Sequence, residues 1–135
     1  MHTWVLPYAS TVLAMGAAAG LLLLQLVILD VVGITARHTP GAPVVADHGN
    51  LFFRATRAHA NTNESIAAFA LLAVFGILSA ASPSWLNGSS WVYVSARVGH
   101  MLCYYLGLQL PRSACFAVGL LALFAMLVVG LQAWT

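Results

Sequence analysis

Long apolar stretches fill most of this chain and leave few ways to fold it. They cover residues 4–35, 52–81, 91–110 and 112–134. A helix of about 20 residues crosses the hydrocarbon core of a bilayer, and each stretch reaches that length. Backbone groups in lipid must be hydrogen-bonded internally, so each stretch is expected to be a helix. The sequence predicts an all-α integral membrane protein, a four-helix bundle forming a single domain over residues 1–135.

The scarcity of charge supports a membrane location. Only 6% of the 135 residues are charged, whereas a soluble domain carries about 25%. The chain contains no lysine and its formal net charge is +2. No basic stripe is present that would neutralise phosphates, which excludes a nucleic-acid-binding protein.

Turn-forming residues separate the apolar stretches. Pro40, Gly41 and Pro43 lie in a polar loop that follows the first stretch. Residues 82–90 are rich in serine, with a proline and a glycine, and are expected to form the second loop. Pro111 is expected to break the chain before the fourth helix.

The arginines predict how the bundle is oriented. Arg37, Arg54, Arg57 and Arg112 all lie at the side of the first and third connections. The positive-inside rule places that side in the cytoplasm and both termini outside. Basic residues that are all arginine, together with abundant alanine, are compatible with a GC-rich bacterium. We therefore expect a multi-pass protein of the bacterial inner membrane.

Two polar stripes interrupt the apolar pattern. In the second helix the stripe residues are spaced 3, 4 and 3 apart and fall within roughly 80° of one another, and in the third helix they fall within roughly 60°. The first stripe comprises Arg54, Arg57, Asn61 and Glu64, and the second Arg97, His100 and Tyr104.

Glu64 and Arg97 are expected to pair. They lie roughly 18 Å and 20 Å from the cytoplasmic ends of their helices, and an isolated charge at that depth is costly. The pair would form the floor of a polar pocket open to the cytoplasm. A purely structural ion pair is the alternative. The stripes hold more polar groups than one ion pair needs, which favours a ligand pocket.

The histidines and cysteines suggest no further site. His59 and His100 lie on differently oriented faces, which disfavours haem ligation, and no metal site is expected. Cys103 and Cys115 fall in apolar segments and are expected to be packing residues.

At these stripes the chain resembles a known family. Residues 54–69 contain the pattern R-A-H-x-N-x-x-E, and residues 96–113 contain R-x-x-H-x-x-x-Y followed by a proline–arginine turn. Both segments resemble signatures of the MAPEG family, the membrane-associated proteins of eicosanoid and glutathione metabolism. The resemblance covers roughly residues 51–120.

The resemblance implies a homotrimer that binds glutathione, its cosubstrate, between neighbouring subunits. It implies that Arg112 lies beside the glutathione sulfur and that Ser113 also reaches the thiol, which makes them the candidate catalytic residues. The candidate glutathione-binding residues are Arg57, Asn61, Glu64, His100 and Tyr104, to which the expected ion pair adds Arg97.

The implied function is a membrane-bound glutathione-dependent transferase or peroxidase. Its second substrate would be a small lipophilic electrophile that arrives from the bilayer. Two other classes remain open. One is a non-catalytic subunit or lipid-binding protein of the same fold. The other is a small multidrug transporter, which relies on a central acid in its first helix, whereas Asp30 lies near that helix's cytoplasmic end.

Overall fold

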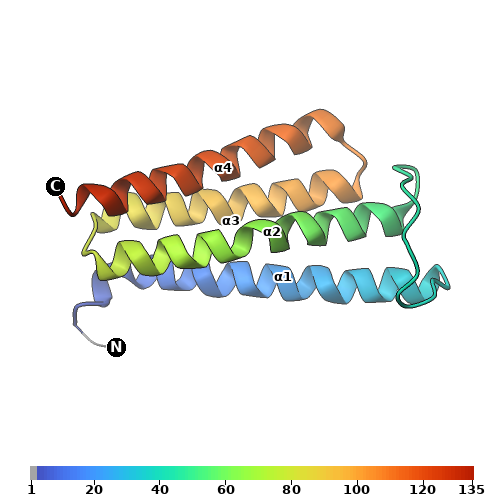
Figure 1. Ribbon diagram of the computed structural model, residues 1–135, viewed down its shortest axis with the longest axis horizontal. Coiled ribbons are helices and arrows are strands. Elements are labelled where there is room, and N and C mark those ends of the chain that lie inside the picture. Colours follow the sequence, from blue (N-terminus) through green and yellow to red (C-terminus); the bar gives the residue numbers. More distant parts are fainter. Residues whose placement is uncertain (1–2) are drawn as a thin grey trace.

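Four antiparallel helices make up the protein, and the computed structural model describes residues 3–135 (Figure 1). A short 3₁₀ turn, η1 (Leu6–Tyr8), precedes the first helix. The helices are α1 (Ala9–Thr35), α2 (Leu51–Leu78), α3 (Pro83–Tyr105) and α4 (Gln109–Gln132). The predicted all-helical bundle is confirmed.

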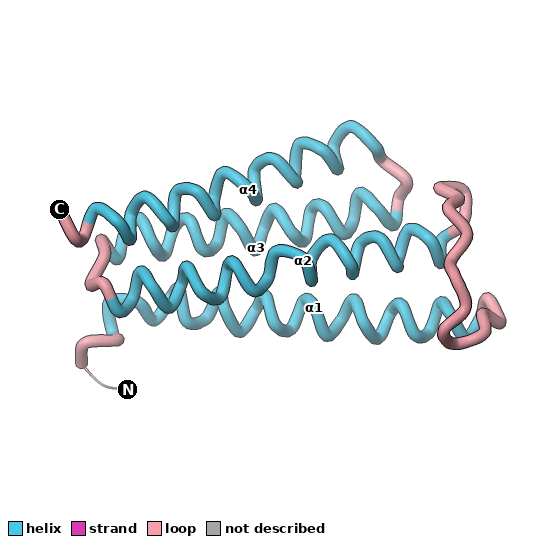
Figure 2. Tube along the Cα trace, viewed as in Figure 1, coloured by secondary structure: helices cyan, strands magenta, loops and turns pink. Residues whose placement is uncertain are grey.

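The connections lie as the sequence predicts. The long loop between α1 and α2 and the short α3–α4 turn lie at one end of the bundle, here called the loop end (Figure 2). The C-terminus, the α2–α3 connection and the start of the described chain lie at the opposite end, here called the terminal end.

The helices identify an integral membrane protein. Leu6–Thr35, Leu51–Leu78 and Gln109–Gln132 are long and apolar enough to cross a bilayer. α3 is less apolar, but its 23 residues extend about 35 Å. Its most polar side chains, including Arg97 and His100, are buried inside the bundle. α3 therefore tolerates polar residues because the other helices shield them from lipid.

The start of α3 corrects the sequence prediction. Residues 82–90, expected to be a loop, are helical from Pro83 onward. Pro83 occupies the first turn, where a backbone N–H is not needed. Leu86 is fully buried, and a Cβ at Gly76 would lie only 2.8 Å from its methyl groups. Close packing of α3 on α2 thus outweighs the turn propensity of these serines.

Other helix ends also differ from the prediction. α2 stops at Leu78, three residues early, because Ala80 adopts a positive φ of 51° and Ala81 N–H bonds back to the Gly76 carbonyl. α3 ends at Tyr105 instead of residue 110, where Gly107 turns the chain with a φ of 73°. Pro111 does not break the chain, since it lies in the first turn of α4.

Hydrogen bonds between distant segments tie the terminal end together. The Asn87 side chain accepts from Thr11 N–H at 3.0 Å and from Thr11 Oγ1 at 2.7 Å, and donates to the Pro7 carbonyl at 3.0 Å. The Tyr8 hydroxyl donates to the Ala81 carbonyl at 2.6 Å. The first turns of α1 are therefore anchored to the start of α3.

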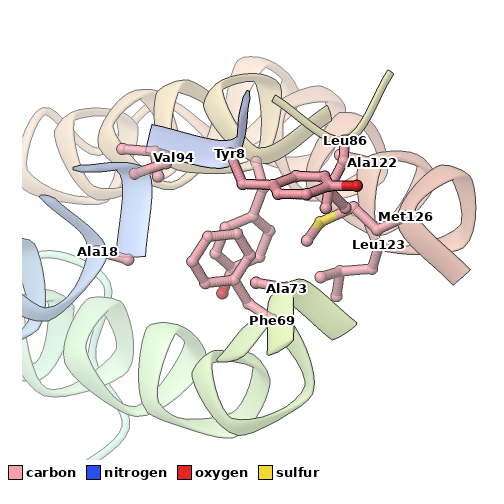
Figure 3. Close-up of a cluster of buried hydrophobic side chains, with 11 residues drawn as sticks. Tyr8, Ala18, Phe69, Ala73, Leu86, Val94, Ala122, Leu123 and Met126 are labelled. Atoms are coloured by element: carbon pink, nitrogen blue, oxygen red, sulfur yellow. The ribbon is translucent and has the colours of Figure 1, made fainter. Parts of the chain in front are cut away.

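The apolar core occupies the terminal half of the bundle (Figure 3). The rings of Phe69 and Tyr93 stack there, with centroids 4.4 Å apart. The remaining cluster members are Tyr8, Ala14, Ala18, Ala73, Leu86, Val94, Ala122, Leu123 and Met126. This packing joins all four helices and leaves the two polar stripes of α2 and α3 to the loop half.

Candidate functional site

A small cavity opens between α2, α3 and α4 in the loop half of the bundle. Its volume is about 190 Å³. Five of the residues that line it are candidates from the sequence, and the sixth is Phe116 on α4. The lining residues are Asn61, His100, Tyr104, Arg112, Ser113 and Phe116. The three helices thus bring together side chains that are up to 55 residues apart in the chain (116 − 61).

Tyr104 and Arg112 meet because the α3–α4 turn is short. Gly107 provides the left-handed backbone of the turn, and the guanidinium of Arg112 lies over the Tyr104 ring, 4.4 Å from its centroid. This contact is a cation–π interaction. It holds the Arg112 charge at the mouth of the cavity. The Ser113 hydroxyl donates to the Gln109 carbonyl at 3.3 Å.

His100 carries an unsatisfied polar atom in the wall of the cavity. Its ring packs edge-on against Tyr104, with centroids 5.0 Å apart. The residue is 2% exposed, and its Nδ1 has no hydrogen-bond partner among residues 3–135. A buried polar atom without a partner is costly, so this nitrogen has a hydrogen-bonding capacity that the described residues of the subunit leave unused.

Arg97 lies behind the cavity and is also 2% exposed. Its Nη1 donates to Asn61 Oδ1 at 2.7 Å. Its guanidinium carbon lies 5.3 Å from the Tyr93 ring centroid and 5.4 Å from that of Phe116. One hydrogen bond and two aromatic faces thus hold this charge.

The predicted Glu64–Arg97 ion pair is wrong for the single subunit: the described residues form no such pair, because Arg97 bonds to Asn61 instead. Glu64 and Arg57 are exposed on the side of the subunit. Glu64 points roughly 150° away from the buried face of α2, whereas Asn61 lies at the edge of that face. Within residues 3–135, Asn61 is the one member of the stripe on α2 that forms a hydrogen bond with α3.

Arg54 has a structural contact outside the cavity. Its Nη1 donates to the carbonyls of His48 and Gly49 at 2.7 and 3.1 Å. Arg54 therefore fixes the end of the long loop against the first turn of α2.

The sequence analysis missed two residues that shape the site. Phe116 lies one helical turn after Arg112, and this i, i+4 spacing was the available signal. Gly119 gives Arg97 its room, because a Cβ there would lie 3.1 Å from Nη2 and 3.4 Å from Nε of Arg97. No local pattern distinguishes Gly119 from the other glycines of these helices.

Replacing Gly119 with leucine is expected to lower the free energy of unfolding by about 1–3 kcal/mol, because the added side chain overlaps the Arg97 guanidinium. Gly20→Leu is the matched control, since a Cβ at Gly20 meets nothing within 4 Å. Thermal unfolding in detergent, followed by circular dichroism, measures both. Equal melting temperatures for the two variants would contradict the close packing of Arg97 on Gly119.

The fold and the cavity define a class: a small multi-pass membrane protein whose polar side chains converge between three helices. Residues 11–132 of the 135-residue chain match the MAPEG family. The chain therefore belongs to the MAPEG family, the membrane-associated proteins of eicosanoid and glutathione metabolism. No curated protein matches it in sequence.

Proposed function

We propose that the protein is a glutathione-dependent transferase or peroxidase acting on small lipophilic electrophiles. The observation that carries the proposal is the shared cavity of His100, Tyr104, Arg112 and Ser113. It combines the positive charge of Arg112 with the hydroxyl groups of Tyr104 and Ser113 and the ring of His100. These are groups that suit an anionic peptide with a thiol.

The residues have distinct roles in the proposed reaction. Arg112 stabilises the glutathione thiolate, which is the nucleophilic form. The Ser113 hydroxyl rotates away from the Gln109 carbonyl and donates its hydrogen bond to the thiolate instead. In the transfer reaction the sulfur forms a bond to the electrophilic carbon as the leaving group departs. In the peroxidase reaction the thiolate attacks the peroxide oxygen and releases an alcohol. A second glutathione then displaces water from the sulfenic acid to give glutathione disulfide.

Arg57 and Glu64 would bind the rest of glutathione. Both are exposed on α2, one turn before and one turn after Asn61, so they continue the cavity across the subunit surface. Arginine binds carboxylates bidentately, and Glu64 can accept from the ammonium group. A charged glutamate on the side of a membrane helix also needs protein or water beside it.

The site is proposed to be completed by neighbouring subunits of a homotrimer. The cavity in one subunit holds about 190 Å³, less than the roughly 300–1,000 Å³ of ordinary small-molecule pockets. A second subunit beside Arg57 and Glu64 would enlarge it and cover both charges. We place the trimer in a bacterial inner membrane with the loop end in the cytoplasm, because four of the five arginines lie at the loop end.

Titration calorimetry of the purified protein in detergent tests the proposal. Glutathione is expected to bind with saturable heat, and S-methylglutathione to compete for the same site. An absence of binding heat at several temperatures, from a protein that remains helical, would refute the glutathione function.

Replacing Glu64 with glutamine is expected to weaken glutathione binding about 10- to 100-fold, because a charge-assisted hydrogen bond to the ammonium group is lost. Asp30→Asn is the matched control, since Asp30 is exposed on α1 and outside the cavity. Calorimetry compares the two affinities. A drug-resistance assay in cells that express each variant separates this function from the transporter class. If Asp30→Asn abolished resistance while Glu64→Gln left glutathione binding unchanged, the transporter class would be favoured instead.

A further inference from the structure

We propose that Cys103 and Cys115 are a redox pair that organic hydroperoxides in the bilayer convert to an intramolecular disulfide. They are the only two cysteines of the chain, and both are free thiols here. Neither lines the cavity described above. The proposal does not depend on glutathione chemistry.

The packing of α3 on α4 brings the two thiols together. Cys115 points into the interface, and its Sγ lies 3.0 Å from where a Cβ on Gly99 would be. Gly99 therefore leaves space on α3 that the Cys115 side chain fills. Cys103 is four residues after Gly99, one turn further along the same face of α3. Cys115 on α4 therefore lies beside the same face of α3 that carries Cys103.

Helix direction brings the two side chains closer. In any α-helix the Cα–Cβ bonds tilt toward the N-terminus. The side chain of Cys103 on α3 thus tilts back toward the Gly99 turn. That of Cys115, on the antiparallel α4, tilts toward the α3–α4 turn and hence toward Cys103. Opposed tilts of this kind shorten the gap that a disulfide must span.

The pair is also accessible. Both cysteines are half-buried, and Leu102 and Leu106 beside Cys103 are 48% and 71% exposed, so this flank faces lipid. Cys103 lies two residues from the end of α3 and Cys115 six residues after the start of α4. A lipid-soluble oxidant and a water-soluble thiol reductant can therefore both reach the pair.

The proposed chemistry proceeds in two steps. One thiolate attacks the hydroperoxide oxygen, which breaks the O–O bond, releases an alcohol and leaves a sulfenic acid. The second thiol then attacks that sulfur and displaces water, which forms the disulfide. Two molecules of a small thiol reverse the process by exchange and leave as their own disulfide. The disulfide would join the two helices that carry Tyr104 and Arg112.

The test treats the full-length protein in detergent with cumene hydroperoxide in the absence of glutathione. Free thiols, counted by maleimide labelling after denaturation, are expected to fall from two per chain to none. Dithiothreitol is expected to restore both, and non-reducing electrophoresis to show a single chain. Peptide mapping should identify the Cys103–Cys115 cross-link. Cys103→Ser and Cys115→Ser are matched controls and should form no reducible bond within the chain.

Three results would overturn the proposal. Both thiols of the wild-type protein could survive the treatment. They could be lost in a form that dithiothreitol does not restore. A disulfide-linked dimer could form in place of the internal bond. Each result concerns the wild-type protein and is independent of whether glutathione binds.

Discussion

Replacing Arg112 with leucine is expected to lower the rate of glutathione conjugation about 100- to 1,000-fold, the usual effect of removing one preorganised charge from an active site. Arg112 lies over the Tyr104 ring at the mouth of the cavity, where its charge would stabilise the thiolate. The fall should appear in the catalytic rate more than in glutathione affinity, because the other binding groups remain. Stopped-flow measurement with an activated chloronitrobenzene gives both parameters.

Two variants make this result specific. Arg37→Leu removes an arginine from the loop at the same end of the bundle, outside the cavity, and should leave the rate unchanged. Arg112→Lys keeps the charge but loses the planar group on Tyr104, and should retain an intermediate rate. A wild-type rate for Arg112→Leu, with helicity preserved, would exclude Arg112 as the group that activates the thiol.

Replacing Asn61 with leucine is expected to destabilise the protein more than replacing its partner Arg97. Asn61 Oδ1 is the acceptor for Arg97 Nη1, and Arg97 Nε already lacks a partner within the described chain. Asn61→Leu therefore leaves a buried cation without its hydrogen bond, which costs about 3–5 kcal/mol. Arg97→Met removes the charge and is expected to cost about 1–3 kcal/mol.

The double variant tests the coupling between these two residues. With both polar groups removed, Asn61→Leu/Arg97→Met should be more stable than Asn61→Leu alone, which gives a non-additive cycle. Asn63→Leu is the control, because Asn63 is an exposed asparagine on the same helix. Melting temperatures in detergent provide the four comparisons. Additive effects of the two substitutions would show that Asn61 does not support the Arg97 charge.

The helical bundle could be predicted because lipid permits few alternatives for long apolar segments. Helix ends were less predictable, since they depend on contacts that local sequence does not reveal. Residues 82–90 have the composition of a loop, yet Leu86 packs against Gly76 and Asn87 bonds to the first turns of the chain. Pro111 has the properties of a chain break, yet it lies in the first turn of α4.

Most residues that line the cavity were predictable from the sequence, but their contacts were not. Helical spacing placed His100 and Tyr104 together, and the resemblance to the MAPEG family added Arg112 to the site. The partner of Arg97 was not predictable, because Asn61 and Glu64 lie on the same stripe within one turn. The rotation of α2 about its own axis decides whether Arg97 on α3 reaches Asn61 or Glu64. The packing of the apolar core at the terminal end sets that rotation.

The anchoring of α1 through Asn87 imposes an order on biosynthesis. Thr11 cannot acquire its partner until the ribosome has added the 76 residues that separate it from Asn87. At the usual 5–20 residues per second this takes roughly 4–15 s. Until then the first span lacks its hydrogen bonds to the start of α3. The arrival of α3 then fixes the N-terminal turns in place.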